Sequence, residues 1–254
     1  MPKQSKFIWY ELMTSDLAGA EDFYKSVIGW NTERWPGEMP YVIAKAGDRS
    51  VGGLMDIPEE AKAMGARPMW LAYIHADDVD AATESVRQAG GKVYREPADI
   101  PEVGRFSVVA DPQGAMFMLM TPDMEGQPPL PDGTPGTVGW NELYAGDGPS
   151  AFDFYSSQFG WTKDQAMDMG DMGIYQIFAI DGKMCGGMMT KPENVPAPMW
   201  QFYFNVDGLD AALARVKEKN GKVVLEPMQV PGGSWIAGCL DPQGALFSLV
   251  SMER

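Results

Sequence analysis

The sequence lacks the features that mark several classes of protein. It has no apolar run near the roughly 18 residues of a membrane-spanning helix. Its first residues, MPKQSKFIWYEL, contain no apolar signal-peptide core. Only 2 cysteines occur among 254 residues, too few for a disulfide framework or a cysteine zinc site. The sequence therefore predicts a cytoplasmic protein with no membrane partner.

Basic residues and histidine are also scarce. The chain has 20 Lys and Arg against 35 Asp and Glu, a formal net charge of −15, and both halves are acidic. Such a charge repels phosphate backbones, so we expect no nucleic-acid partner. The only histidine is His75, which excludes a histidine-rich metal site and a Ser–His–Asp triad in each half. We expect this histidine on the surface.

What the sequence does contain is an internal repeat over nearly its whole length. DPQGAMFMLM at residues 111–120 returns as DPQGALFSLV at residues 241–250. DFYKSVIGW at residues 22–30 returns as DFYSSQFGW at residues 153–161. Because the motifs keep their order, the chain is a tandem duplication of a copy one and a copy two.

A segment rich in proline and glycine separates the two copies. Its sequence, TPDMEGQPPLPDGTPGTVG, cannot sustain a helix or a central strand. We therefore expect domain 1 at residues 1–122, a linker at 123–137 and domain 2 at 138–254.

Each copy contains a weaker repeat of its own. After a strand-like run at residues 7–13, Asp16 can cap a helix with apolar residues at i, i+3, i+4 and i+7, and Gly29 can end it. The second half starts again with the strand MWLAYIH and a helix capped by Asp77 or Asp78. Strand-like runs follow both helices, and DPQG is typical of a hairpin turn. The predicted order is strand–helix–strand–strand–strand, four times in the chain.

Paired modules of this order, with FY and GW after the first strand and DPQG before the last, resemble the vicinal oxygen chelate superfamily. That superfamily includes glyoxalase I, extradiol dioxygenases and bleomycin-resistance proteins, and the resemblance covers about residues 7–121 and 138–252. It implies an α+β fold of four βαβββ modules that form two glyoxalase-like domains with curled mixed sheets. It also implies a cleft in which His or Gln, His, and Glu hold a divalent metal.

The resemblance places the three metal-ligand positions of copy one at Trp9, Leu71 and Met118. An indole N–H only donates hydrogen bonds, an isobutyl group has no donor atom and a thioether is a soft ligand. None of these side chains suits a hard or borderline cation. We therefore expect no metal in copy one, where these residues would line an apolar ligand cleft.

In copy two the same positions fall at Trp140, Gln201 and Ser248. They offer at most two neutral oxygens, so the sequence assigns no cofactor here and allows only a weak divalent-metal site. The three residues, within apolar walls, fit the pattern of a ligand pocket with few polar groups.

Glu11 and Glu142 are the candidate catalytic residues. Each lies two residues after Trp9 or Trp140, so both members of a pair project from the same strand face. A carboxylate in an apolar cleft can act as a general acid or base. The alternative is a structural role, with the carboxylate hydrogen-bonded to backbone or to a tryptophan N–H. The sequence leaves both open.

Two functions are compatible with these residues. One is a bleomycin-resistance-like protein that binds a small hydrophobic or aromatic molecule, with the metal triad largely lost. The other is a lyase or dioxygenase, either metal-assisted or using Glu142 as acid and base. A degenerate scaffold with filled clefts is a third possibility. We expect a small-molecule ligand, greater dependence on copy two, and either a monomer with an intramolecular pseudo-dimer or a homodimer.

Overall fold

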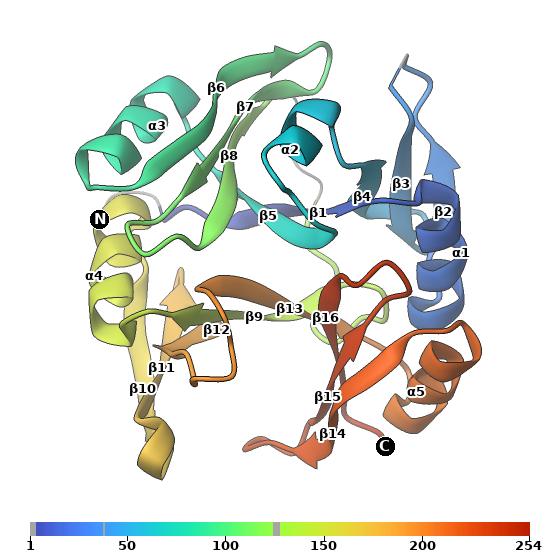
Figure 1. Ribbon diagram of the computed structural model, residues 1–254. Coiled ribbons are helices and arrows are strands. Elements are labelled where there is room, and N and C mark those ends of the chain that lie inside the picture. The colour runs from blue at the N-terminus through green and yellow to red at the C-terminus, as the bar shows by residue number, and fades with distance from the viewer. Residues whose placement is uncertain (1–3, 38, 124–127) are drawn as a thin grey trace. The chain divides into compact units, whose positions relative to one another are not determined.

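The computed structural model describes residues 4–37, 39–123 and 128–254 (Figure 1). The elements of copy one are β1 (Phe7–Thr14), α1 (Leu17–Ile28), β2 (Asn31–Arg34), β3 (Tyr41–Ala46), β4 (Arg49–Asp56), α2 (Glu59–Ala63), β5 (Met69–His75), α3 (Val79–Gln88), β6 (Lys92–Ile100), β7 (Gly104–Ala110) and β8 (Met116–Pro122). The elements of copy two are β9 (Val138–Ala145), α4 (Gly148–Phe159), β10 (Thr162–Asp168), η1 (Gly170–Met172), β11 (Ile174–Ile180), β12 (Lys183–Thr190), β13 (Met199–Asn205), α5 (Leu209–Glu218), β14 (Lys222–Gln229), β15 (Trp235–Leu240) and β16 (Leu246–Ser251).

The strands form two mixed eight-stranded sheets. Their orders are β2-β3-β4-β1-β5-β8-β7-β6 and β10-β11-β12-β9-β13-β16-β15-β14. The first modules are β1–β4 with α1 in copy one and β9–β12 with α4 in copy two. The second modules are β5–β8 with α3 and β13–β16 with α5. This confirms the predicted α+β fold of four βαβββ modules.

The helix ends follow from the residues that the sequence singled out. The Asp16 carboxylate accepts a hydrogen bond from the Gly19 N–H at the start of α1, and Gly29 ends the helix in the left-handed conformation with φ 86°. Asp78, and not Asp77, caps α3 by accepting from the Ala81 N–H. Two short helices, α2 and η1, were not predicted. Within the described ranges, no helix combines the length and apolar character needed to cross a membrane.

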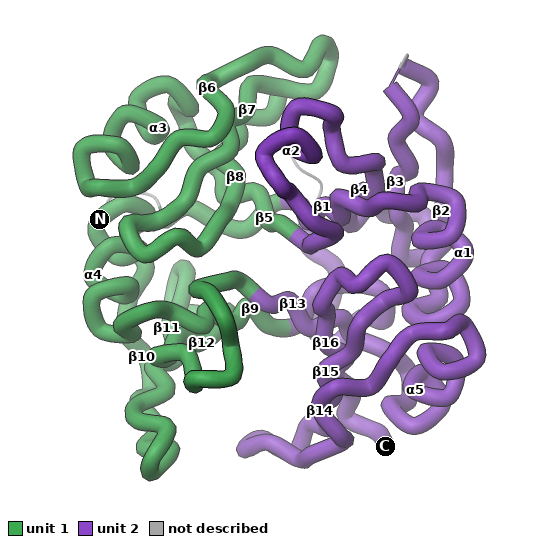
Figure 2. The backbone as a smooth tube through the Cα atoms, viewed as in Figure 1, with its two compact units in different colours: residues 1–8, 71–128, 140–200 green, residues 9–70, 129–139, 201–254 purple. Residues whose placement is uncertain are grey.

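The chain separates into two compact units, and each unit draws on both copies (Figure 2). Unit 1 consists of residues 1–8, 71–128 and 140–200, and so contains the second module of copy one and the first module of copy two. Unit 2 holds the other two modules.

Within unit 2, a buried set of hydrogen bonds joins helix α1 to the DPQG turn of the other copy. The Tyr24 hydroxyl donates to Asp241 at 3.1 Å and accepts from Trp70 Nε1 at 2.9 Å. The other carboxylate oxygen of Asp241 accepts the N–H groups of Gln243 and Ala245, which closes the turn. Burial raises the pKa of both Tyr24 and Asp241. The FY and DPQG motifs are thus partners across the two copies.

Unit 1 repeats this arrangement with the copies exchanged. The Tyr155 hydroxyl donates to Asp111 at 3.2 Å and accepts from Trp200 Nε1 at 3.0 Å. Burial again raises the pKa of the aspartate and of the tyrosine. This exchange explains why both motifs occur twice, since each motif supplies one side of a contact in each unit.

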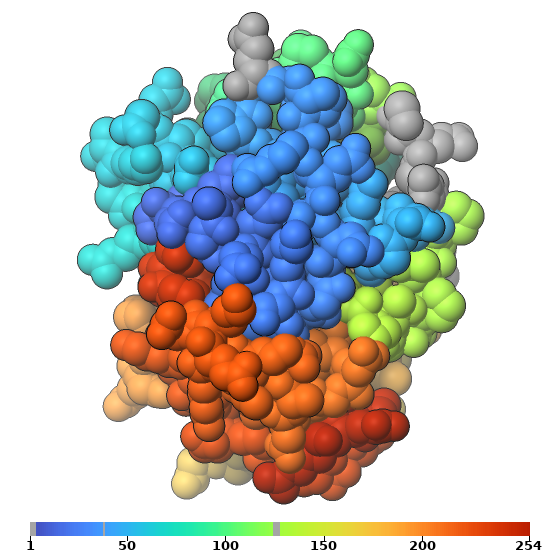
Figure 3. Space-filling view, turned by 90° about the vertical axis from the view of Figure 1, so that its right-hand side faces the viewer, coloured from blue at the N-terminus to red at the C-terminus, as the bar shows by residue number. Residues whose placement is uncertain are grey.

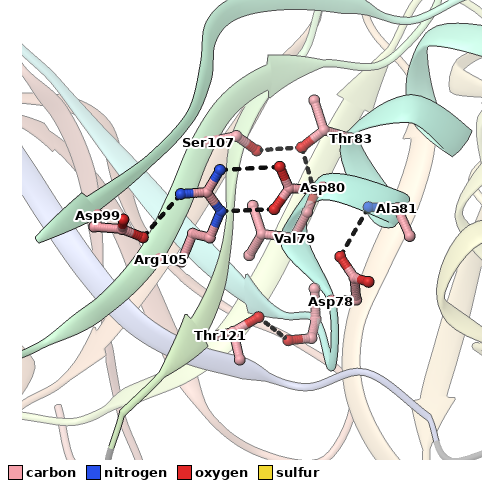
Figure 4. Close-up of polar contacts among 10 residues, drawn as sticks. Asp78, Val79, Asp80, Ala81, Thr83, Asp99, Arg105, Ser107 and Thr121 are labelled. Atoms are coloured by element: carbon pink, nitrogen blue, oxygen red, sulfur yellow. Dashed lines mark hydrogen bonds and ion pairs between the residues drawn. The ribbon is translucent and has the colours of Figure 1, made fainter.

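Polar contacts also attach α3 to its sheet (Figure 4). Arg105 on β7 binds both carboxylate oxygens of Asp80, at 2.6 and 2.9 Å. The buried Thr83 hydroxyl donates to the Val79 carbonyl at 2.6 Å and lies 2.8 Å from the Ser107 hydroxyl. Because Thr83 has one proton to donate, Ser107 is the donor in their contact.

Candidate functional site

The first module of copy one contains a chain of hydrogen bonds that ends on a carboxylate. Trp9 Nε1 donates to the Tyr41 hydroxyl at 2.9 Å, and that hydroxyl donates to Glu11 Oε2 at 3.0 Å. Trp9 and Glu11 come from β1, whereas Tyr41 comes from β3. We call this arrangement the Trp–Tyr–Glu chain. Because one hydroxyl contacts both β1 residues, Trp9 and Glu11 project from the same face of the strand.

A glycine makes the chain possible. Strand β4 lies between β1 and β3, and its Gly53 pairs with Glu11 on one side and with Ile43 on the other. A Cβ atom at Gly53 would lie 1.8 Å from the Tyr41 hydroxyl oxygen. The tyrosine ring therefore crosses β4 directly over Gly53, where no other residue would leave room.

The first module of copy two repeats the arrangement. Trp140 Nε1 donates to the Tyr175 hydroxyl at 2.7 Å, and Tyr175 is hydrogen-bonded to Glu142. Gly187 pairs with Glu142, and a Cβ atom at Gly187 would lie 2.1 Å from the ring carbon Cζ of Tyr175. The two modules thus conserve the Trp–Tyr–Glu chain together with the glycine beneath it.

Burial and charge decide which group in the chain carries the proton. Glu11 and Glu142 are only 6% and 7% exposed. Burial, followed by the facing carboxylate, raises the pKa of Tyr41 and of Tyr175. Both hydroxyls therefore stay protonated at neutral pH and donate to the glutamates. The sequence left open a direct hydrogen bond from a tryptophan N–H to the carboxylate. In the structure that N–H donates to the tyrosine hydroxyl instead.

The Trp–Tyr–Glu chain lies on the less buried face of the first module. On β1 and β4, the paired Leu12 and Leu54 point to the opposite face and are fully buried. Trp9, Tyr41 and the paired Met13 and Met55 are only half-buried. The carboxylate therefore lies at the floor of a partly accessible surface of aromatic rings and thioethers.

A small pocket opens at the end of this face in copy one. It has a volume of about 260 Å³ and lies between Met39 and Met55 on one side and the α2 segment on the other, where Ile57 and Lys62 line it. Copy two has no helix at the equivalent residues 191–198, which the structure describes in full. The helix that lines the pocket is therefore a feature that distinguishes the two first modules.

The second modules hold the remaining predicted residues. In copy one, Leu71 and Met118 are buried on the neighbouring strands β5 and β8. In copy two, Gln201 Nε2 donates to Ser248 Oγ, and both side chains are buried. The structure thus brings Gln201 and Ser248 together within unit 2.

The predicted sets are divided between the two units. Trp9 and Glu11 belong to unit 2, whereas Leu71 and Met118 belong to unit 1. In copy two, Trp140 and Glu142 belong to unit 1, and Gln201 and Ser248 belong to unit 2. Each Trp–Tyr–Glu chain and the Gln201–Ser248 pair accordingly lies inside a single unit.

The side chains at the predicted positions do not fit the divalent metal of the vicinal oxygen chelate superfamily. Both tryptophan N–H groups donate to tyrosines, and the Gln201 amide donates to Ser248. Among the residues described, no three His, Cys, Asp or Glu side chains are grouped so as to hold a metal ion. These side chains therefore supply no basis for metal chemistry, and the expected absence of a bound metal stays a prediction.

The two cysteines and the single histidine lie outside these chains of contacts. Cys239 is buried and burial raises its thiol pKa to about 12, whereas Cys185 is half-buried with a pKa raised to about 11 for the same reason. His75 is at the end of β5, with its ring 3.7 Å from the Asp77 carboxylate. Its side chain is 23% exposed and thus reaches the surface in part.

Sequence reasoning missed Tyr41 and Tyr175. The signal was present, because each tyrosine is the first or second residue of its strand and lies at the same distance in sequence before the second glycine of a Gly-Gly pair. The pairing register was needed to interpret it.

The comparisons with known proteins agree on one family. The model of the Glyoxalase/Bleomycin resistance protein/Dioxygenase superfamily matches residues 6–119 and 137–249. "Putative glyoxylase CFP32" of Mycobacterium tuberculosis is 33% identical, with 98% of both chains covered. "Anthracycline biosynthesis protein DauV" of Streptomyces sp. is 32% identical, with 97% of this chain and 93% of the relative covered.

Solved structures share the fold at lower identity. The Mn(II)-bound glyoxalase from Novosphingobium aromaticivorans has a TM-score of 0.65 at 17% identity, covering 99% of this chain and 83% of that one. The 2,3-dioxygenase LapB from Pseudomonas sp. KL28 has a TM-score of 0.67 at 14% identity, covering 99% and 93%.

Proposed function

Because the chain belongs to the Glyoxalase/Bleomycin resistance protein/Dioxygenase superfamily, we propose that it binds a small hydrophobic or aromatic molecule on the half-buried faces of its first modules. The observation that carries the proposal is the Trp–Tyr–Glu chain. Its indole and phenol rings are partly accessible, and each chain has a buried carboxylate at its floor. A planar ligand stacks favourably on such rings, and a polar group at its edge can hydrogen-bond to the floor.

The surroundings of the chain support an apolar ligand. Met13 and Met55 lie beside the rings in copy one, and methionine adapts to irregular apolar shapes. Two relatives are named for anthracycline biosynthesis, and anthracyclines are fused-ring aromatic compounds. Both observations favour a flat aromatic molecule over a sugar or a nucleotide.

The test is a titration with a hydroxyanthraquinone as a planar probe, followed by tryptophan fluorescence. Trp9→Leu and Trp140→Leu should each weaken binding at their own module, because a stacking partner is lost. Trp235 is also half-buried but stacks under Arg254 elsewhere in unit 2, so Trp235→Leu is the matched control. Equal affinity in all three variants would exclude these faces as the binding site.

We further propose that binding depends more on copy two. Besides Glu142 and Tyr175 in unit 1, copy two carries the separate polar pair of Gln201 and Ser248 in unit 2, whereas copy one has Leu71 and Met118 at the positions of that pair. Glu142→Gln and Gln201→Leu should therefore weaken binding more than Glu11→Gln does. Thermal stability is measured in parallel, since a purely structural carboxylate would lower stability in both copies without changing affinity selectively.

A second candidate function is metal-free acid–base catalysis, favoured by the position of Glu142. This carboxylate is buried and accepts a hydrogen bond from the hydroxyl of the protonated Tyr175, which fixes the orientation of the carboxylate. Relatives named as a glyoxylase and as a "Probable lactoylglutathione lyase" support a test of lactoylglutathione formation. Activity that persists in chelator and disappears in Glu142→Gln would support catalysis, whereas inactivity with intact ligand binding would leave binding as the function.

A further inference from the structure

The two units differ at one pair of equivalent helices. In unit 2, Lys219 at the end of α5 places its ammonium group 2.8 Å from the Asp22 carboxylate on α1. The repeat makes Asp153 on α4 the counterpart of Asp22, and Ala89 after α3 the counterpart of Lys219. Unit 1 therefore keeps the carboxylate and lacks the cation.

The missing side chain leaves a groove. It has a volume of about 650 Å³ and is lined by Ala89, Gln113, Ser150, Asp153 and Phe154, all within unit 1. This size is in the range of small-molecule sites. In unit 2, by contrast, the blue first module packs directly against the orange residues around α5 (Figure 3).

The charges in the groove are those that attract a cation. Asp153 is exposed, and among the described residues no basic side chain pairs with it. Two further carboxylates line the groove but are already engaged. Asp147 accepts hydrogen bonds from Ser150, and the buried Asp111 accepts one from Tyr155. The net charge of −15 adds a general attraction for cations.

We propose that this groove of unit 1 binds a small organic cation, with a primary ammonium group on Asp153 and an apolar stem over Ala89 and Phe154. The chemistry is that of a lysine side chain, because a lysine occupies the equivalent place in unit 2. The site is independent of the Trp–Tyr–Glu chains, so the proposed function can fail without affecting it.

The experiment is a titration of the full chain with 1,5-diaminopentane, followed by the backbone amide signals of Gln113, Ser150 and Asp153 in NMR spectra. We expect saturable shifts with a Kd of about millimolar, because an exposed ion pair contributes little. Binding should weaken with salt. The neutral 1,5-pentanediol is the control ligand and should give no saturation.

Four variants make the test specific. Asp153→Asn should weaken binding roughly two- to fivefold, the range for an exposed ion pair, while the matched Asp22→Asn should leave it unchanged. Ala89→Lys should abolish binding by supplying an internal ammonium. Lys219→Ala should open an equivalent groove in unit 2 and raise the stoichiometry from one to two.

Two results would overturn the proposal. One is the absence of saturable shifts in the unmodified protein, or equal shifts with the diol. The other is an affinity that is unchanged by Asp153→Asn together with binding that persists in Ala89→Lys.

Discussion

Replacing Gly53 by alanine should break the Trp–Tyr–Glu chain of copy one without touching any of its three side chains. The three atoms nearest to an added Cβ all belong to Tyr41, and the closest is its hydroxyl oxygen at 1.8 Å. The ring must therefore move away from Gly53. It then loses the hydrogen bonds from Trp9 at 2.9 Å and to Glu11 at 3.0 Å.

The expected cost follows from those two bonds. A typical intramolecular hydrogen bond contributes about 0.5–1.5 kcal/mol, so losing both costs about 1–3 kcal/mol. Alanine itself is more favourable than glycine inside a strand by about 0.5–1 kcal/mol. With the midpoints of these ranges, Gly53→Ala should destabilise the protein by about 1 kcal/mol in urea unfolding followed by far-UV circular dichroism.

A double-mutant cycle separates this cause from a general effect on the strand. In a Tyr41→Ala background the ring is gone, so Gly53→Ala should become neutral or stabilising. Gly187→Ala in a Tyr175→Ala background should behave in the same way. If Gly53→Ala costs the same with and without Tyr41, the ring does not depend on the glycine and the reasoning fails.

Three further predictions concern the cores of the two units. Tyr24→Phe and Tyr155→Phe should each lower the free energy of unfolding by about 1–3 kcal/mol, measured by urea unfolding, because a buried carboxylate and a tryptophan N–H lose their partner. Ser107→Ala should cost about 1 kcal/mol in the same assay, since its hydroxyl donates to Thr83 inside the protein; no measurable loss would contradict that contact. Burial raises the pKa of Asp241 above 3.8. As the pH falls, the folded state therefore binds a proton before the unfolded state does, and this proton binding stabilises the folded state at low pH. The stabilisation is lost as the pH rises through the folded pKa. The stability difference between the unmodified protein and Asp241→Asn should therefore shrink as the pH rises above 3.8, and a difference that grows would refute the sign.

The module order could be predicted from sequence because its signals are local. Asp16 and Gly29 mark the ends of α1 through contacts within one helical turn, and the repeat supplies an independent second reading of each module. Helix α2 has five residues and none of them is buried, so it leaves no apolar periodicity to detect. A short exposed helix of this kind therefore cannot be recognised from the spacing of its apolar residues.

The candidate site was predicted only in part because its key contacts are not local. Glu11 and Glu142 were found from their spacing to the neighbouring tryptophans. Tyr41 reaches Glu11 across an intervening strand, so the contact depends on the register of three strands and on Gly53 between them. Periodicity within one strand carries no such information.

The same limit applies to the contacts between the FY and DPQG motifs. Both motifs and their duplication are plain in the sequence. That Tyr24 bonds to Asp241 of the other copy, rather than to Asp111 of its own, depends on which modules pack together. A repeat alone is equally compatible with either pairing.

The exchange of partners between the copies restricts how the gene can change. A duplicated domain is ordinarily free to be lost, since its sibling folds without it. Here the removal of either copy would take one module from each compact unit, leaving Tyr24 without Asp241 or Tyr155 without Asp111. A shortened descendant would have to recover the missing module from a second polypeptide, so the two copies must stay fused. A change in the FY helix of one copy also selects for a compensating change in the DPQG turn of the other copy.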